Sequence, residues 1–173
     1  MKYIKLGNSD LNVSRICMGC MAFGDAQSGQ HRWTLDEEHS REIIKRGLEL
    51  GVNFYDTAIA YQGGTSEQYV GRALRDFAKR EDVIVATKFL PRTQTEIEAG
   101  VTGQQHIENM INLSLEHLGM DYVDLYIYHM WDYQIGKSPG STWANQLFSI
   151  EPSIACAAKI TSVFCSVVKL NKS

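Results

Sequence analysis

Residues 51–58 read Gly51-Val-Asn-Phe-Tyr-Asp-Thr-Ala58, and this stretch decides the fold. A glycine readily adopts the left-handed conformation that ends a helix, so Gly51 is predicted to stop a preceding helix. Residues 52–55 are typical of a short buried strand, and Asp56 follows them with a charge. A helix stop, a short strand and a reactive residue in this order indicate one unit of a parallel α/β sheet.

The same order recurs along the chain with a period of about 35 residues. Capping boxes predict that amphipathic helices begin at Thr34–Glu37, Thr65–Gln68 and Thr102–Gln105. Further apolar strands are predicted over residues 83–87 and 122–128. This alternation predicts parallel βαβ units, and strands without polar alternation indicate burial on both faces. A flavodoxin-like open sheet and a (β/α) barrel both fit the periodicity.

The two ends of the chain depart from this repeat. Extended runs over residues 3–6 and 11–16 predict an N-terminal β-hairpin, whose second run leads into a first buried strand. After Trp131 the alternation fails. Residues 135–149 are predicted to form a loop, and residues 150–170 fit either one helix or two short strands.

Composition restricts the possible partners. The chain has 173 residues, enough for one domain with a core, and a formal net charge of −3. Lys and Arg are scattered, so neither nucleic acid nor a membrane surface is an expected partner. The N-terminus lacks the apolar run of a secretory signal, and we therefore expect a cytoplasmic protein. In that compartment four cysteines are expected as free thiols: Cys17, Cys20, Cys156 and Cys165.

Four reactive residues follow or end predicted strands. Asp56 follows the strand at 52–55, and Tyr61 lies in the next loop. Lys88 ends the strand at 83–87, and His129 ends the strand at 122–128. Because the carboxyl ends of parallel strands meet at one edge of the sheet, these side chains are expected to converge.

The four side chains suit proton donation to a carbonyl oxygen. A phenol is a poor acid at neutral pH, but a neighbouring ammonium favours the phenolate. Asp56 is expected to pair with Lys88 and orient it, so that Tyr61 protonates the oxygen while a hydride reaches the carbon. His129 is expected to hydrogen-bond the same oxygen. No metal ion is required, since the histidines are dispersed along the chain.

These residues stand in segments that resemble the aldo-keto reductases, most closely the bacterial branch whose first loop reads Gly-x-Met-x-Phe-Gly. The matching segments cover roughly residues 1–133 and are Gly19–Gly24, Gly51–Ala58 with Tyr61, Ser66–Leu74, Val85–Lys88 and Leu118–Leu125 with His129.

The resemblance implies a (β/α)8 barrel that binds NADPH without a Rossmann motif and reduces aldehydes and ketones to alcohols. It assigns proton donation to Tyr61, the acidifying ammonium to Lys88, its support to Asp56 and substrate orientation to His129. Four residues are implied to contact the cofactor, the first three of them at the nicotinamide end: Gly19, Cys20, Met21 and Asp56. Two aromatic residues after the histidine are implied to line the substrate mouth, Trp131 and Tyr133.

The resemblance stops well before the end of a barrel. Family members continue through four more βα units that hold the cofactor carboxamide and the adenosine phosphate. We interpret residues 134–173 as a non-homologous tail, and the chain as a frameshift or truncation product of about four βα units. The open edges of half a barrel predict self-association.

Three functions fit this interpretation. The chain is a reductase completed by a partner or a second copy, a non-catalytic interaction or cofactor-sensing module, or an inactive product. Two simpler interpretations accompany them. No second Cys-x-x-Cys motif accompanies Cys17-Met-Gly-Cys20, so its cysteines are interpreted as packing thiols rather than a redox or zinc site. The remaining histidines are interpreted as surface residues: His31, His39, His106 and His117.

Overall fold

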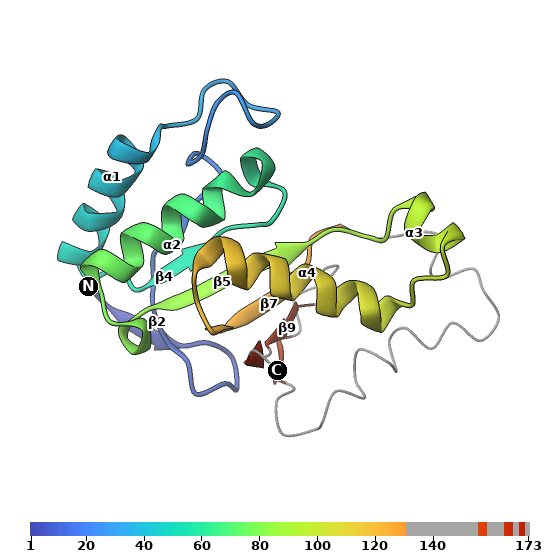
Figure 1. Ribbon diagram of the computed structural model, residues 1–173. Helices are drawn as coiled ribbons and strands as arrows, with labels where there is room; N and C mark the ends of the chain where they lie inside the picture. Colours follow the sequence, from blue (N-terminus) through green and yellow to red (C-terminus); the bar gives the residue numbers. More distant parts are fainter. Residues whose placement is uncertain (131–155, 159–164, 168–169, 172–173) are drawn as a thin grey trace.

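Parallel strands that pair in chain order form the centre of the computed structural model, which describes residues 1–130, 156–158, 165–167 and 170–171 (Figure 1). These strands are β3 (Cys17–Gly19), β4 (Phe54–Asp56), β5 (Ile84–Phe89) and β7 (Leu125–Tyr128). β5 is buried along most of its length, as its apolar sequence predicts. β3 is exposed or half-buried, so the prediction of a first buried strand was wrong.

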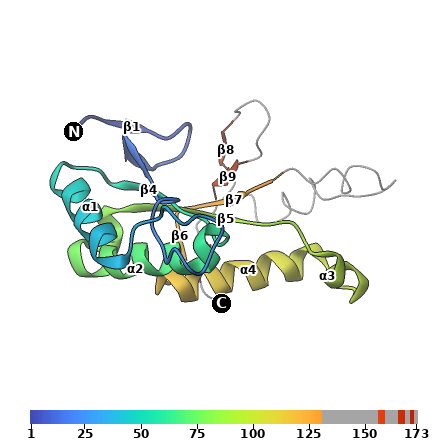
Figure 2. The ribbon, with the colours of Figure 1, turned by 90° about the horizontal axis from the view of Figure 1, so that it is seen from above.

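Three long helices connect these strands: α1 (Glu37–Glu49), α2 (Thr65–Phe77) and α4 (Gly103–Leu118). Figure 2 shows all three on the same side of the strands. Shorter helical turns lie in the loops: η1 (Tyr61–Gly64), η2 (Arg80–Asp82) and α3 (Gln94–Glu98). A sheet whose order follows the chain, with helices on one face, is wound like a barrel, whereas a flavodoxin-like sheet reverses its order.

Short antiparallel strands flank this unit. β1 (Tyr3–Lys5) and β2 (Asn12–Ser14) form the predicted hairpin. β9 (Cys165–Val167) pairs with β7 and with β8 (Cys156–Ala158), while β10 (Leu170–Asn171) pairs with β6 (Tyr122–Val123). The strand edge expected to be open beside β7 is therefore paired within the chain. Of the two alternatives for residues 150–170, these strands agree with the extended one; the rest of the tail, with Trp131 and Tyr133, lies outside the described residues.

Two of the three predicted helix caps were wrong in position. Asp36, not Thr34, caps α1 and accepts a hydrogen bond from the backbone N–H of His39. Thr65 is the first residue of α2, and its hydroxyl donates to the carbonyl oxygen of Gln62. Threonine hydroxyls are equally able to bond loop carbonyls, so the motif alone does not fix the cap.

The third predicted cap was correct. Thr102 caps α4, and both hydrogen bonds of its capping box with Gln105 are present. A further capping box that the sequence interpretation omitted, Thr93 with Glu96, opens α3. The residues after β5 therefore form a small helix before α4 begins.

The larger hydrophobic cluster lies between the sheet and the three helices, and a smaller one lies between the sheet and the N-terminal hairpin. Within the larger cluster α2 packs closely on α4. Gly71 of α2 lies against the backbone of Leu118, the last residue of α4. A methyl group at Gly71 would overlap the Leu118 carbonyl oxygen, and a backbone atom of a packed helix cannot move aside readily.

Gly71→Ala is therefore expected to lower the free energy of unfolding by about 1–3 kcal/mol, despite the better helix propensity of alanine. Urea unfolding measures this change. Gly19→Ala is the matched control, because its added methyl meets no atom within 4 Å. Equal stability of the two variants would contradict the packing described for α2 and α4.

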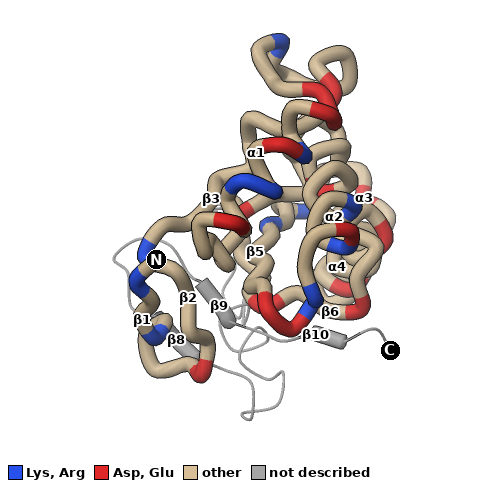
Figure 3. Tube along the Cα trace, turned by 90° about the vertical axis from the view of Figure 1, so that its left-hand side faces the viewer, with Lys and Arg blue, Asp and Glu red and all other residues tan. Residues whose placement is uncertain are grey.

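Charges of both signs are interspersed over the helical layer (Figure 3). Arg72 of α2 bonds Glu37 of α1 through two hydrogen bonds of 2.7 and 2.8 Å. Arg41 of α1 pairs with Asp76 of α2. These pairs link the two helices at their surface. Within the described part of the chain, no helix is long and apolar enough to cross a membrane.

Candidate active site

The structure brings the four predicted residues together at the carboxyl ends of the strands. Asp56 is the last residue of β4, one position further than the predicted strand reached. Tyr61 begins η1 in the loop that follows, and Lys88 lies inside β5, next to its last residue. His129 directly follows β7. Their convergence agrees with the rule that neighbouring parallel strands end at one edge.

Lys88 is the centre of the cluster. Its ammonium lies 2.9 Å from Oδ1 of Asp56, and it donates hydrogen bonds to the Tyr61 hydroxyl at 3.2 Å and to the Thr57 carbonyl oxygen at 2.7 Å. The contact with Asp56 is an ion pair without the alignment of a hydrogen bond. The Lys88 side chain is 12% exposed and that of Asp56 is 32% exposed, so the charges are partly shielded from water.

His129 stands beside the phenol. The ring centroids of Tyr61 and His129 are 5.6 Å apart, and the rings are nearly perpendicular. Burial, and next the charge of Lys88, hold the pKa of His129 below its ordinary value of 6.5, although Asp56 opposes them. His129 is therefore neutral at neutral pH. Its Nδ1 atom is buried and has no hydrogen-bond partner among the described residues.

The lowered pKa of His129 predicts a pH dependence of stability. Below pH 6.5 the unfolded chain binds a proton at this histidine more readily than the folded protein does. The neutral histidine therefore contributes fully to the free energy of unfolding above pH 6.5. This contribution is expected to be lost as the pH falls below 6.5. Urea unfolding of the wild type and of His129→Gln over this range isolates it. Parallel pH profiles for the two proteins would contradict the assignment.

The turn that carries Tyr61 is held by its neighbour. Gln62 has a φ of 48°, in the left-handed region, and its side chain is buried. The amide nitrogen donates to the carbonyl oxygens of Asp25 and His31, and the amide oxygen accepts from the His31 backbone N–H. Such a conformation costs about 1–3 kcal/mol and persists only where the surroundings fix it, so the loop before α1 determines the position of Tyr61.

The predicted cofactor residues lie beside Asp56 at the end of β3. Gly19 is the register partner of Asp56, and the position of a Cβ atom on it is open. Met21 is 41% exposed. Cys20 is fully buried: its thiol donates to the Met18 carbonyl oxygen, and burial raises its pKa far above the usual range. Of these three residues of the first loop, Gly19 and Met21 therefore present open surface, and Cys20 does not.

Three buried residues in or directly behind the site were missed by the sequence interpretation. Thr57 accepts from Lys88 through its backbone oxygen, which no side-chain pattern reveals. Ser66 and Glu67 lie in the first turn of α2 and are fully buried. Reading them as part of a capping box obscured the signal that was present, an acidic residue on the apolar face of an amphipathic helix.

Two of the four histidines interpreted as surface residues are not. His106 is buried, with Nδ1 2.9 Å from the Glu96 carboxylate and Nε2 2.8 Å from the Leu90 carbonyl oxygen. Both partners are hydrogen-bond acceptors, one from α3 and one from the loop after β5, so the imidazole links these two segments. His117 is largely buried against Glu67. In both cases a carboxylate takes the place of water beside the imidazole. The hydropathy of the sequence does not reveal such a partner.

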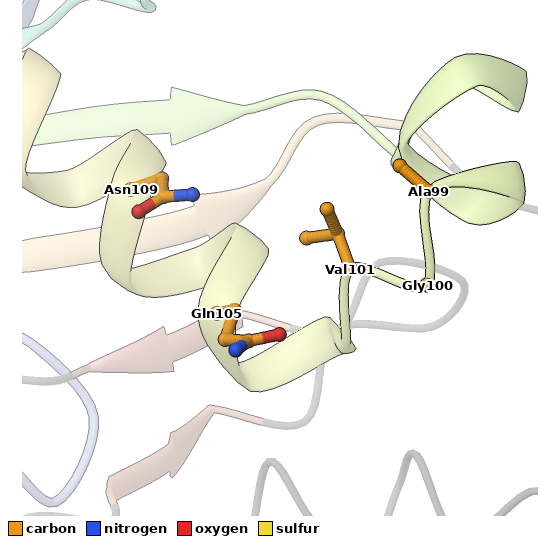
Figure 4. Close-up of a pocket in the computed structure, with 5 residues that line it drawn as sticks. All are labelled: Ala99, Gly100, Val101, Gln105 and Asn109. Atoms are coloured by element: carbon orange, nitrogen blue, oxygen red, sulfur yellow. The ribbon is translucent and has the colours of Figure 1, made fainter.

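A separate hollow lies where α3 meets the first turns of α4 (Figure 4). Its volume is about 360 Å³. It is lined by Ala99, Gly100, Val101, Gln105 and Asn109. None of the four convergent residues lines it, and its uncharged surface offers no group for acid–base chemistry.

Comparison with known proteins decides the family. The family model described as the aldo/keto reductase family matches residues 15–159. The chain belongs to the aldo/keto reductase family. It is 37% identical to the aryl-alcohol dehydrogenase GME11368 of Pestalotiopsis microspora over 132 residues, which are 73% of this chain and 34% of that protein. It is 34% identical to the "Probable voltage-gated potassium channel subunit beta" of Oryza sativa subsp. japonica over 134 residues, or 76% of this chain and 38% of the relative.

A solved structure confirms the fold of this aldo/keto reductase chain. The aldo-keto reductase AKR11C1 from Bacillus halodurans, solved in a holo form, superimposes with a TM-score of 0.60 at 32% identity. The match covers 86% of this chain and 47% of that structure. The predicted (β/α)8-type architecture is thus confirmed for the consecutive parallel strands β3, β4, β5 and β7. The chain spans about a third of the length of the two curated relatives named above.

Proposed function

We propose that this chain carries the proton-donating site of an NADPH-dependent reductase that converts aldehydes and ketones to alcohols. The observation that carries the proposal is the position of the Lys88 ammonium, in contact with Asp56 on one side and with the Tyr61 hydroxyl on the other. An ammonium that donates a hydrogen bond to a phenol oxygen stabilises the phenolate that forms when the phenol gives its proton to a substrate. Two oxidoreductases among the similar proteins support the same reaction class.

Each residue of the cluster has a distinct part in this proposal. The Tyr61 hydroxyl donates its proton to the carbonyl oxygen, and the Lys88 ammonium stabilises the phenolate that remains. Asp56 orients the ammonium through their ion pair. His129, neutral because of its lowered pKa, offers one N–H to the same carbonyl oxygen and so sets the orientation of the substrate.

The nicotinamide end of the cofactor fits beside β3. NADPH supplies a hydride to the carbonyl carbon when it is bound. Gly19 presents backbone with open space around it, and Met21, two residues later, is an exposed apolar residue. Cys20 contributes through its backbone, whose N–H is bonded to the Asp56 carbonyl oxygen and thereby fixes the loop to β4. Free thiols at Cys17 and Cys20 are consistent with the cytoplasmic location that we propose.

NADPH consumption by the purified chain tests this function. Aromatic and aliphatic aldehydes are supplied with NADPH, and the expected result is oxidation of the cofactor that depends on both the aldehyde and the protein. Equal rates with and without the chain, across the aldehydes, would remove the proposal. A parallel series with NADH separates preference for the phosphorylated cofactor from general nicotinamide use.

A second candidate is an interaction module without turnover. The similarity to the rice channel subunit favours it, since that relative is named for assembly with a channel. The outer side of β3 pairs with no other strand among the described residues, so it offers backbone hydrogen-bonding groups to another chain or a second copy. Sedimentation distinguishes the candidates: a defined oligomer that does not bind NADPH supports the interaction role, and an NADPH-binding monomer excludes it.

A further inference from the structure

Two adjacent buried residues of α2 lie behind the cluster and bond residues within, or directly after, the strands that carry it. The Ser66 hydroxyl donates to the Cys20 carbonyl oxygen at 2.8 Å and lies 3.1 Å from the Thr57 hydroxyl. One carboxylate oxygen of Glu67 accepts a hydrogen bond of 2.6 Å from the Thr87 hydroxyl. Each of the three strand partners is next in sequence to a site residue: Gly19, Asp56 or Lys88.

Glu67 is the residue of this pair whose burial demands an explanation. Its side chain is completely buried, and its second carboxylate oxygen lies 2.9 Å from Nδ1 of His117 in the last turn of α4. The hydrogen bond from His117 to Glu67 raises the pKa of the histidine, although burial opposes it. A buried acid that is bonded on both oxygens is retained at a cost in desolvation, and such groups fix one arrangement of the elements around them.

The contacts of Glu67 and His117 reach both the strand of Lys88 and the turn of Tyr61. Thr87 precedes Lys88 in β5, and successive strand residues point to opposite faces, so fixing Thr87 on the helix side directs Lys88 to the site side. His117 lies directly against Gly64, the last residue of the η1 turn that Tyr61 begins; a side chain at Gly64 would overlap the imidazole.

We infer that Glu67 is a positioning residue for the acid–base cluster: through Thr87 on one side and His117 on the other, it sets the placement of Lys88 relative to Tyr61 and His129. The inference rests on the proposed function of the cluster. It assigns Glu67 no contact with substrate or cofactor.

The pKa of His129, measured by NMR of its imidazole signals, tests the inference without requiring turnover. Lys88 is one of the causes that hold this pKa down. If Glu67→Gln lets the ammonium move away, the His129 pKa is expected to rise measurably toward its ordinary value. The direct effect of removing a negative charge has the opposite sign, since it lowers the pKa of a histidine. An upward shift therefore reports displacement of Lys88.

Thr87→Val and Thr87→Ser complete the test. Valine keeps the volume but removes the hydroxyl without changing any charge, so it is expected to raise the His129 pKa, whereas serine retains the hydroxyl and is expected to leave it unchanged. Glu116→Gln is the charge-matched control, because Glu116 is an exposed neighbour of His117. Should Glu67→Gln fail to fold, the comparison of Thr87→Val with Thr87→Ser tests the inference by itself.

The inference is overturned if the folded Glu67→Gln and Thr87→Val variants keep the wild-type His129 pKa or lower it, or if the serine variant behaves like the valine variant. Failure of the proposed function gives a different result. A wild-type chain that does not consume NADPH removes the reductase assignment but leaves the His129 shifts as they are.

Discussion

Tyr61→Phe is expected to lower kcat for NADPH-dependent carbonyl reduction by about 10²–10⁴-fold, the usual contribution of a general acid. The substitution removes only the hydroxyl, so the aromatic contact with His129 is retained. The Lys88 ammonium keeps its ion pair with Asp56 and its hydrogen bond to the Thr57 carbonyl oxygen. NADPH affinity is therefore expected to stay within about twofold of the wild type, since the lost interaction belongs to the transition state.

Tyr69→Phe provides the control for the loss of a phenol. Tyr69 lies on α2, contacts Arg72 and touches none of the four site residues in the described contacts. Its variant is expected to turn over as the wild type does. Steady-state kinetics and an NADPH titration of both variants complete the comparison. Retained turnover in Tyr61→Phe would remove Tyr61 from the role of proton donor.

Lys88→Met is expected to lower kcat by about as much as Tyr61→Phe, because the two residues act as one unit. Methionine keeps the unbranched shape of the lysine side chain as far as Cε but has no ammonium group. It therefore loses the ion pair of 2.9 Å with Asp56 and the hydrogen bond of 3.2 Å to the Tyr61 hydroxyl. Without the ammonium, the phenolate left after proton transfer has no neighbouring cation to stabilise it.

The double variant shows whether Tyr61 and Lys88 lower kcat through one shared step or through two independent steps. Tyr61→Phe combined with Lys88→Met is expected to lose little more than either single variant, because the lysine acts only through the phenol. Lys45→Met, on the surface of α1 near Phe77, is the control for removing an ammonium. Multiplicative losses in the double variant would show that Lys88 acts by another route.

Convergence of the site was predictable because it follows from topology. Asp56, Lys88 and His129 each lie at or next to the end of a strand, and the carboxyl ends of paired parallel strands cannot lie far apart. Strand bounds that were one or two residues short did not alter this result. The family resemblance, carried by the same segments, is confirmed by the match over residues 15–159.

Tertiary contacts decided what the sequence could not. The Thr65 hydroxyl donates to the carbonyl oxygen of Gln62 and accepts from the backbone N–H of Asp25, which lies 40 residues earlier in the chain. The hydroxyl therefore holds the loop rather than capping the helix. The burial of Glu67 depends on His117, which lies fifty residues later in the chain. Local patterns describe which side chains are polar, but not which distant partner replaces water around them.

An NADPH titration of the purified chain, followed through the fluorescence of the nicotinamide, tests the account most directly. The open position of Gly19 beside Asp56 predicts saturable binding of NADPH. Gly19→Leu, which introduces a bulky side chain there, is expected to lower the affinity for NADPH. A wild-type chain whose addition leaves the NADPH fluorescence unchanged at all concentrations would contradict the assignment of this edge of the sheet as a reductase site.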